Sequence, residues 1–316
     1  MEPPLITIGI ASFNALTSIE KAVNSALSQS WCPIEIIVVD DCSSDGTYEK
    51  LLKLSSKNQA IRVFKNKKNY GIGYVRNQII KKAHGEFLAF FDDDDESLQE
   101  RLKLQYQRIK DYEKLVKSSL IICHSSRKVI YPGGKIRIEK ALGSNINTSS
   151  LFGFPVAKRI LLGKPLKDGY GACPTCCQMA RTSTYKSVNG FDPGFRRSED
   201  TDFCIRLAMN GGHFVGISEP LIVQRMSKTL DKNLDIEFKF ANLLLKKHKN
   251  FIQKYGNYHF CINWQKIKFY FYKREFYEVS ILLFILIIKY PKATLIRFFQ
   301  SLRNIQINID YSLFHK

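Results

Sequence analysis

The amino-acid sequence predicts an α/β protein with a mostly parallel sheet flanked by helices, followed by a helical, basic C-terminal extension. Short β-branched runs alternate with helical patterns over residues 5–91, and the loops between them are short. This alternation is typical of parallel strands joined by crossover helices. The extension is predicted by residues 228–316, where sixteen Lys and Arg stand against six Asp and Glu, a net charge of +10.

Four strands and three helices are predicted in the N-terminal region, from apolar β-branched runs and amphipathic periodicity respectively. The expected strands are Leu5–Ala11, Ile34–Asp40, Ile61–Phe64 and Glu86–Phe91. The expected helices between them are Ser18–Gln29, Tyr48–Leu54 and Tyr74–Ala83. Ligands of such sheets bind beyond the carboxyl ends of the strands, and Asn14, Asp41 and Asp92–Asp95 all fall there.

The second half of the chain is less regular, and residues 133–168 are expected to form a long loop. A helix is expected a few residues after the fourth strand, and the remaining strands and helices are predicted by the same criteria. The expected strands are Leu120–His124, Lys128–Tyr131, Cys177–Arg181 and His213–Ile217, and the expected helices are Ser97–Ile109, Thr182–Val188 and Asp200–Asn210.

The bulk composition is that of a globular protein. The 316 residues are 45% hydrophobic and 24% charged, which allows a sizeable core and argues against global disorder. Eight Cys without a recognisable secretory signal predict free thiols in a reducing compartment, so we expect a cytoplasmic protein. The net charge of +19 favours a polyanionic partner, although a solvated helical face would also explain the basic C-terminal region.

Five acidic residues, "DDDDE", directly follow the apolar run that ends at Phe91. Their mutual repulsion can be cancelled by a divalent cation with oxygen ligands. Mg²⁺ or Mn²⁺ commonly takes one or two protein carboxylates and fills its other positions with water and phosphate oxygens. Asp92 and Asp94 suit this, because residues two apart in an extended segment point the same way. The alternative is a solvated acidic loop that favours the N-terminus of the next helix.

Five segments in order along residues 5–225 resemble the family-2 glycosyltransferases, inverting enzymes of GT-A fold. They are "ITIGIASFN", "VVDDCSSDGT", "NYGIGYVRN", "GEFLAFFDDDDESLQERL" and "GFDPGFRRSEDTDFCIRL". The resemblance implies a nucleotide-diphosphate sugar donor and Mn²⁺ or Mg²⁺ bound through an Asp-x-Asp motif. It also implies a GT-A domain over residues 1–227, with a nucleotide-sugar half (1–115) and an acceptor half (116–227), before a helical basic region (228–316).

The resemblance assigns the donor-binding residues. Ala11 and Phe13 match the loop that holds the nucleotide base, with Asn14 beside them, and Phe13 lacks the hydroxyl of the family's usual Tyr. Asp41 matches the acid that hydrogen-bonds the base, typically uracil, and Arg76 matches a cation near the diphosphate.

Within the acidic run, the resemblance places the metal and the ribose. Asp92 begins the Asp-x-Asp motif, Asp93 matches the ribose-side position and Asp94 the metal ligand. Asp95 is the alternative ligand if the register is shifted by one residue.

The segment "SEDTD" resembles the Glu-Asp motif that supplies the general base. Inverting transfer needs one carboxylate to deprotonate the acceptor hydroxyl. The resemblance makes Asp200 this base, and Glu199 would orient it or contact the acceptor. The alternative is a helix cap, with Ser198 followed by acids in the first turn.

Two other motifs predict no chemistry. "CPTCC", Cys173 to Cys177, lacks a second pair of zinc ligands, so we expect buried or loop thiols there. Gly71-x-Gly73 has Arg76 where a dinucleotide fingerprint needs its third glycine, which argues against a dehydrogenase.

The C-terminal region mixes aromatic residues with cations, as segments at a membrane surface do. The uncharged run Val279–Ile288 is too short to span a bilayer. We therefore expect peripheral attachment to the inner face of an anionic membrane, with a packed helical module as the alternative.

The predicted activity is transfer of a sugar, with uridine as the expected nucleoside, to a hydroxyl of a glycan or lipid-linked acceptor in cell-surface polysaccharide synthesis (the hexosyltransferase class). A sugar-phosphate nucleotidyltransferase is the alternative enzyme, but it would need a Gly- and cation-rich loop where "ASFNALTS" stands. A basic nucleic-acid-binding protein is the alternative without catalysis, and it would not need acids at a sheet edge, so we expect no nucleic-acid partner.

Overall fold

The computed structural model describes residues 2–144, 151–167, 171, 173–226, 233–303 and 305–314. The chain divides into two compact units. The first comprises Met1–Ala157 and Leu166–Met226, and the second comprises Lys158–Pro165 and Ser227–Lys316.

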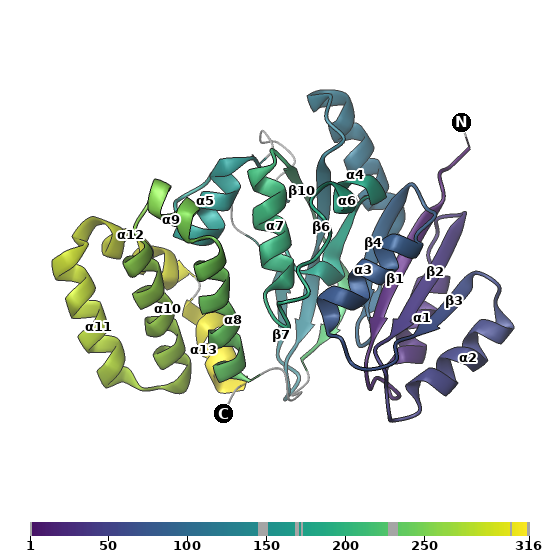
Figure 1. The fold of residues 1–316 in the computed structure, drawn as a ribbon, viewed down its shortest axis with the longest axis horizontal. Coiled ribbons are helices and arrows are strands. Elements are labelled where there is room, and N and C mark those ends of the chain that lie inside the picture. Colours follow the sequence, from purple (N-terminus) through teal and green to yellow (C-terminus); the bar gives the residue numbers. More distant parts are fainter. Residues whose placement is uncertain are drawn as a thin grey trace. The chain divides into compact units, whose positions relative to one another are not determined.

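The first unit contains a mixed β-sheet flanked by helices (Figure 1). Its strands are β1 (Ile6–Ser12), β2 (Ile34–Asp40), β3 (Ile61–Lys65), β4 (Phe87–Asp92), β5 (Glu96–Ser97), β6 (Ile121–Ile130), β7 (Ile136–Glu139), β8 (Leu151–Phe152), β9 (Gln178–Arg181) and β10 (His213–Arg225). The helices are α1 (Ile19–Leu27), α2 (Thr47–Lys57), α3 (Ile72–Lys82), α4 (Arg101–Val116), α5 (Phe154–Leu162), α6 (Thr182–Ser187) and α7 (Glu199–Met209), with a 3₁₀ turn at Thr175–Cys177. Helix α5 extends from the first unit into the second.

The strand order is β3-β2-β1-β4-β9-β6-β10-β5, with β7 beside β6 and β8 beside β10. Strands β1 to β4 pair in parallel, as do β6 and β10, whereas β9 runs antiparallel between β4 and β6. The mostly parallel sheet predicted from the alternating sequence is thus confirmed, and the antiparallel strands β5, β7, β8 and β9 make it mixed.

The two faces of the sheet are covered by different helices because successive strand residues point to opposite sides. Ile8 and Ile10 of β1 belong to one core cluster with Val23 of α1 and Leu102 of α4. On the other face α3 packs against β1. A Cβ atom at Gly9 would lie 2.4 Å from Ile79 Cγ2 of this helix, so the absence of a side chain allows the close approach.

Two predicted strands, Leu120–His124 and Lys128–Tyr131, are one continuous strand, β6. The polar residues that lie between them in the sequence suggested that one strand ends there and another begins. Both Ser125 and Ser126 are buried, and the Ser126 hydroxyl donates to Ile217 O and accepts from Ala141 N. The Ser126 hydroxyl is therefore satisfied within the core, which lets the strand continue through it, whereas Ser125 Oγ has no hydrogen-bond partner among the described residues.

The predicted strand His213–Ile217 continues to Arg225, with a register irregularity at Pro220, and its far end pairs with β5. Since residues 96–97 are in β5, helix α4 begins at Arg101 and not at Ser97. The acidic run therefore precedes a short strand and is not the first turn of a helix, which contradicts the helix-capping alternative.

The long loop predicted over residues 133–168 is wrong where the structure describes it. Strands β7 and β8 and helix α5 lie within this range. Residues 145–150 and Asp168 lie outside the described residues.

The second unit is helical, as predicted for the C-terminal region, although residues 227–232 lie outside the described part. Its helices are α8 (Leu234–Lys247), α9 (Lys249–Tyr255), α10 (Tyr258–Lys273), α11 (Phe276–Lys289), α12 (Pro291–Arg303) and α13 (Ile305–Phe314). Helix α10 buries Phe260, Cys261, Trp264 and Ile267. Among the described residues, none of the helices is both long and apolar enough to cross a bilayer.

The close packing of α3 on β1 gives a stability prediction. Gly9→Ala should lower the free energy of unfolding by about 1–3 kcal/mol, because the added methyl group meets Ile79. In an Ile79→Ala background the same change should cost less, since the atom it contacts is gone. Urea unfolding of the four proteins in this cycle measures the coupling, and equal costs in both backgrounds would contradict the packing argument.

Candidate functional site

The carboxyl ends of β1, β2 and β4 meet at one edge of the sheet. In the parallel register Ala11 pairs with both Val39 and Asp92, and Ser12 pairs with Asp40. The loops that follow these strands therefore lie beside one another, which is where open α/β sheets bind ligands.

Phe13 and Asp93 connect the first of these loops to the acidic run. The backbone N–H of Phe13 donates to Asp93 Oδ2 at 3.0 Å, and the Phe13 side chain is 44% exposed. Burial, with the neighbouring charges of Asp94 and Asp92, raises the pKa of Asp93 to about 7. The backbone of a residue with an exposed aromatic ring is thus tied to a group of carboxyls that repel one another.

Asn14 and Asp41 organise the adjoining loops. Asn14 N donates to Ser43 Oγ, and Asn14 Oδ1 accepts from Ser44 N. The buried Asp41 carboxylate accepts from Asn66 Nδ2 and from the N–H groups of Tyr70 and Gly71 at 2.7–3.0 Å. Asp41, which the resemblance assigned to the nucleotide base, therefore orders the 69–71 loop in this structure.

Arg76 of α3 bridges two carboxylates that are far apart in the sequence. Its guanidinium donates to Glu199 Oε1 at 2.5 Å and to Asp92 Oδ1 at 3.3 Å, and the residue is 5% exposed. Although burial opposes it, the charges of Glu199 and Asp92 raise the pKa of Arg76. The residue expected near the diphosphate thus joins the acidic run to the start of α7.

Glu199 and Asp200 form the first turn of α7. Burial raises the pKa of Glu199 and the charge of Arg76 opposes this. Asp200 Oδ1 accepts from Thr201 N at 2.6 Å and from Thr201 Oγ1 at 3.2 Å. The preceding Ser198 occupies the N-cap position, with acids in the first turn as the alternative expects, but its φ is 65° and its side chain makes no cap hydrogen bond.

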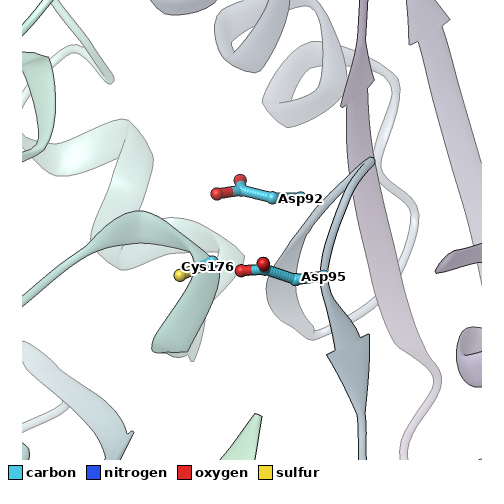
Figure 2. A group of neighbouring side chains, drawn as sticks. All are labelled: Asp92, Asp95 and Cys176. Atoms are coloured by element: carbon cyan, nitrogen blue, oxygen red, sulfur yellow. The ribbon is translucent and has the colours of Figure 1, made fainter. Parts of the chain in front are cut away.

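Asp92, Asp95 and Cys176 form a group whose ligand atoms all lie within 4.8 Å of one another (Figure 2). Asp95 is 3% exposed, and its Oδ2 accepts from Gln224 Nε2 at 3.2 Å. Its Oδ1 is buried and has no hydrogen-bond partner among the described residues. Burial, with the neighbouring Cys176 and Asp92, raises the pKa of Asp95 well above its ordinary value.

These side chains fit a divalent cation. Two carboxylates, one of them with an unsatisfied buried oxygen, are ligands that Mg²⁺ or Mn²⁺ accepts when water and phosphate oxygens complete the coordination. Asp94, the ligand implied by the resemblance, lies outside this group of three, so its role as a ligand stays a prediction.

Cys176 is the member of this group that sequence reasoning missed. Strands β4 and β9 are antiparallel, with Ala89 opposite Met179, and the same register continued by three residues places Cys176 opposite Asp92. A hydrogen bond with Cys177 and burial raise the pKa of the Cys176 thiol. The motif "CPTCC" was visible in the sequence, but the register that brings it to the acidic run was not.

The comparison with protein families identifies the family of this chain. The family model described as "Glycosyl transferase family 2" matches residues 7–183, which include β1 to β9. The chain therefore belongs to glycosyl transferase family 2.

Curated relatives match a shorter segment. The chain is 35% identical over 105 residues to the Escherichia coli UDP-Glc:alpha-D-GlcNAc-diphosphoundecaprenol beta-1,3-glucosyltransferase WfgD, covering 33% of this chain and 41% of that protein. It is 36% identical over 110 residues to the Campylobacter jejuni GalNAc(5)-diNAcBac-PP-undecaprenol beta-1,3-glucosyltransferase, covering 34% and 35%. The matched segments thus span less than half of either relative.

Among solved structures, residues 1–349 of Staphylococcus aureus TarS, in complex with UDP-GlcNAc, share the fold. The TM-score is 0.60 at 17% identity, and the match covers 98% of this chain and 90% of that one. This likeness confirms the predicted GT-A type of fold.

The carboxyl of Asp93 gives a pH prediction. Its pKa of about 7 in the folded state exceeds the ordinary 3.8, so the folded protein keeps a proton that the unfolded chain loses. The contribution of Asp93 to stability should therefore fall as the pH rises from 3.8 to about 7. Asp93→Asn keeps an acceptor for Phe13 N but cannot ionise, so it should be more stable than wild type above this range.

Thermal unfolding in EDTA, followed across this pH range, measures the difference between the two proteins. Asp111→Asn is the control, because Asp111 is exposed and a hydrogen bond from Gln107 lowers its pKa. A stabilisation by Asp93→Asn that is the same at every pH would contradict the prediction.

Proposed function

We propose that this chain is an inverting glycosyltransferase that transfers a sugar from a UDP-sugar to a hydroxyl of a glycan or lipid-linked acceptor. The observation that carries the proposal is the buried Arg76 bridge, which joins Asp92 at the end of β4 to Glu199 at the start of α7. A donor-binding edge and a candidate base are thereby held in one network.

The donor would be bound at the ends of β1, β2 and β4, within the half formed by residues 1–115. The exposed Phe13 ring would stack on the base, with Ala11 and Asn14 shaping the loop and Asp93 near the ribose. Asp92, with Asp94 or Asp95, would hold Mn²⁺ or Mg²⁺. When bound, this cation would supply positive charge to the departing diphosphate.

Asp200 would act as the general base in the acceptor half, residues 116–227. Thr201 holds Asp200 Oδ1, which fixes the carboxylate and leaves Oδ2 as the oxygen we assign to proton transfer. The acceptor oxygen would bond to C1 of the sugar as the bond from C1 to the diphosphate breaks. The electron pair leaves with the diphosphate and the hydroxyl proton passes to Asp200. Attack from the opposite face inverts C1.

The acceptor class is supported by the relatives. The names of two of them specify sugars linked to undecaprenol diphosphate. A lipid-linked acceptor in polysaccharide biosynthesis would be presented at a membrane surface.

Helices α11 and α12 offer a surface suited to such a membrane. Tyr277, Ile281, Phe284 and Ile288 are exposed at helical spacing along α11, with Tyr277 76% and Phe284 63% exposed. On α12 the exposed residues include Leu295, Phe299 and Leu302. The exposed cations Arg274, Lys289 and Lys292 lie at the ends of these helices. We propose that this surface attaches peripherally to the anionic inner face of a membrane.

The base assignment predicts the behaviour of Asp200→Asn. Sugar transfer should fall about a hundredfold or more, because the amide cannot accept the hydroxyl proton. UDP binding, measured by calorimetry, should be unchanged, because the donor edge is intact. The exposed Asp111→Asn variant is the control and should transfer normally. Transfer by Asp200→Asn near the wild-type rate would show that another group is the base.

The membrane assignment predicts the behaviour of a Tyr277→Ser/Phe284→Ser variant. Wild type should co-sediment with phosphatidylglycerol vesicles at low salt and much less with phosphatidylcholine vesicles, because cations flank the apolar surface. The double variant should lose this binding. Leu115→Ser, which removes a side chain of 77% exposure from α4, should retain it. Failure of wild type to sediment with anionic vesicles at low salt would refute the assignment.

A further inference from the structure

The sulfur of Cys176 lies where a cation bound by Asp92 and Asp95 would be coordinated. The three ligand atoms lie within 4.8 Å of one another, and both Asp95 and Cys176 are almost completely buried. Figure 2 shows the Cys176 side chain next to the Asp95 carboxylate. The buried Asp95 Oδ1, which lacks a hydrogen-bond partner among the described residues, is an independent sign that this group is completed by a ligand.

We propose that Cys176 is a ligand of the divalent cation held by Asp92 and Asp95, and that its sulfur makes the site bind Zn²⁺ or Co²⁺ more tightly than Mg²⁺. The inference rests on the proposed function in placing this cation at the donor edge. It goes further by adding a ligand and a metal preference.

The preference follows from the chemistry of the donor atoms. Carboxylate oxygens suit Mg²⁺ and Mn²⁺, whereas a thiolate is a soft ligand that Zn²⁺ and Co²⁺ accept readily. A site with two carboxylates and one sulfur therefore discriminates against Mg²⁺. The sulfur is also held in position, because Arg127, paired with Glu139 at 2.6 Å, places its Nη1 3.9 Å from Cys176 Sγ.

Cys177 provides a matched comparison. It is equally buried and its sulfur lies 3.8 Å from that of Cys176, but it is not part of the group with Asp92 and Asp95. Replacement of either Cys by Ser removes one sulfur from the same 3₁₀ turn. A role in packing alone would make the two variants behave alike.

Titration of the full chain with Co²⁺ tests the proposal, since a thiolate bound to Co²⁺ gives a charge-transfer band in the near ultraviolet. Wild type and Cys177→Ser should show the band, and Cys176→Ser should lose it. Asp95→Asn should weaken Co²⁺ binding. Zn²⁺ at equal concentration should remove the band, whereas the same concentration of Mg²⁺ should leave it.

Absence of the band from wild type, its persistence in Cys176→Ser, or equal competition by Mg²⁺ would each overturn the proposal. Circular dichroism of each variant ensures that only folded proteins are compared.

Calorimetry with UDP in excess Mn²⁺ separates this inference from the proposed function. Donor binding without a cobalt–thiolate band would refute the Cys176 ligand alone, and a band without donor binding would refute the glycosyltransferase alone.

Discussion

The candidate site depends on the buried guanidinium of Arg76. This residue is 5% exposed and contacts carboxylates that lie 16 and 123 residues away in the sequence. A buried charge whose partners are removed is strongly destabilising, by about 3–5 kcal/mol, so the three groups must be retained together. The bridge thereby ties helix α3, the end of β4 and the start of α7 together, and these elements carry the proposed donor edge and the candidate base.

The single positive charge of Arg76 does not balance the negative charge of the acidic side chains at this edge of the sheet. Asp92 to Asp95 and Glu199 present more negative charge than one guanidinium balances, and burial and mutual repulsion raise the pKa of Asp93 and Asp95. A divalent cation would cancel the excess and would attract the phosphates of a nucleotide. In the proposed function, such a cation would account for a run of acids at the sheet edge of a chain of net charge +19.

The strands and the position of the acidic run were predictable from the sequence, because β-branched runs and short crossover connections allow few arrangements. The partners of individual side chains were not predictable. Arg76 meets Glu199 only because α7 returns to the sheet, and Cys176 meets Asp92 only through the antiparallel register of β4 and β9. The hydrogen bonds that Asp41 accepts from the loop at Tyr70 and Gly71 were not predictable either, and its assignment to a nucleotide base by resemblance stays a prediction. Long-range register and loop hydrogen bonds leave no periodic signal in a single sequence.

Calorimetric titration of UDP into the full chain, with Mn²⁺ and with EDTA, tests most directly whether this acidic edge is a cation-dependent nucleotide site. The account predicts binding with Mn²⁺, little or none with EDTA, and loss of the Mn²⁺-dependent binding in Asp92→Asn. Equal UDP affinity in EDTA, or unchanged affinity in the folded Asp92→Asn protein, would contradict it.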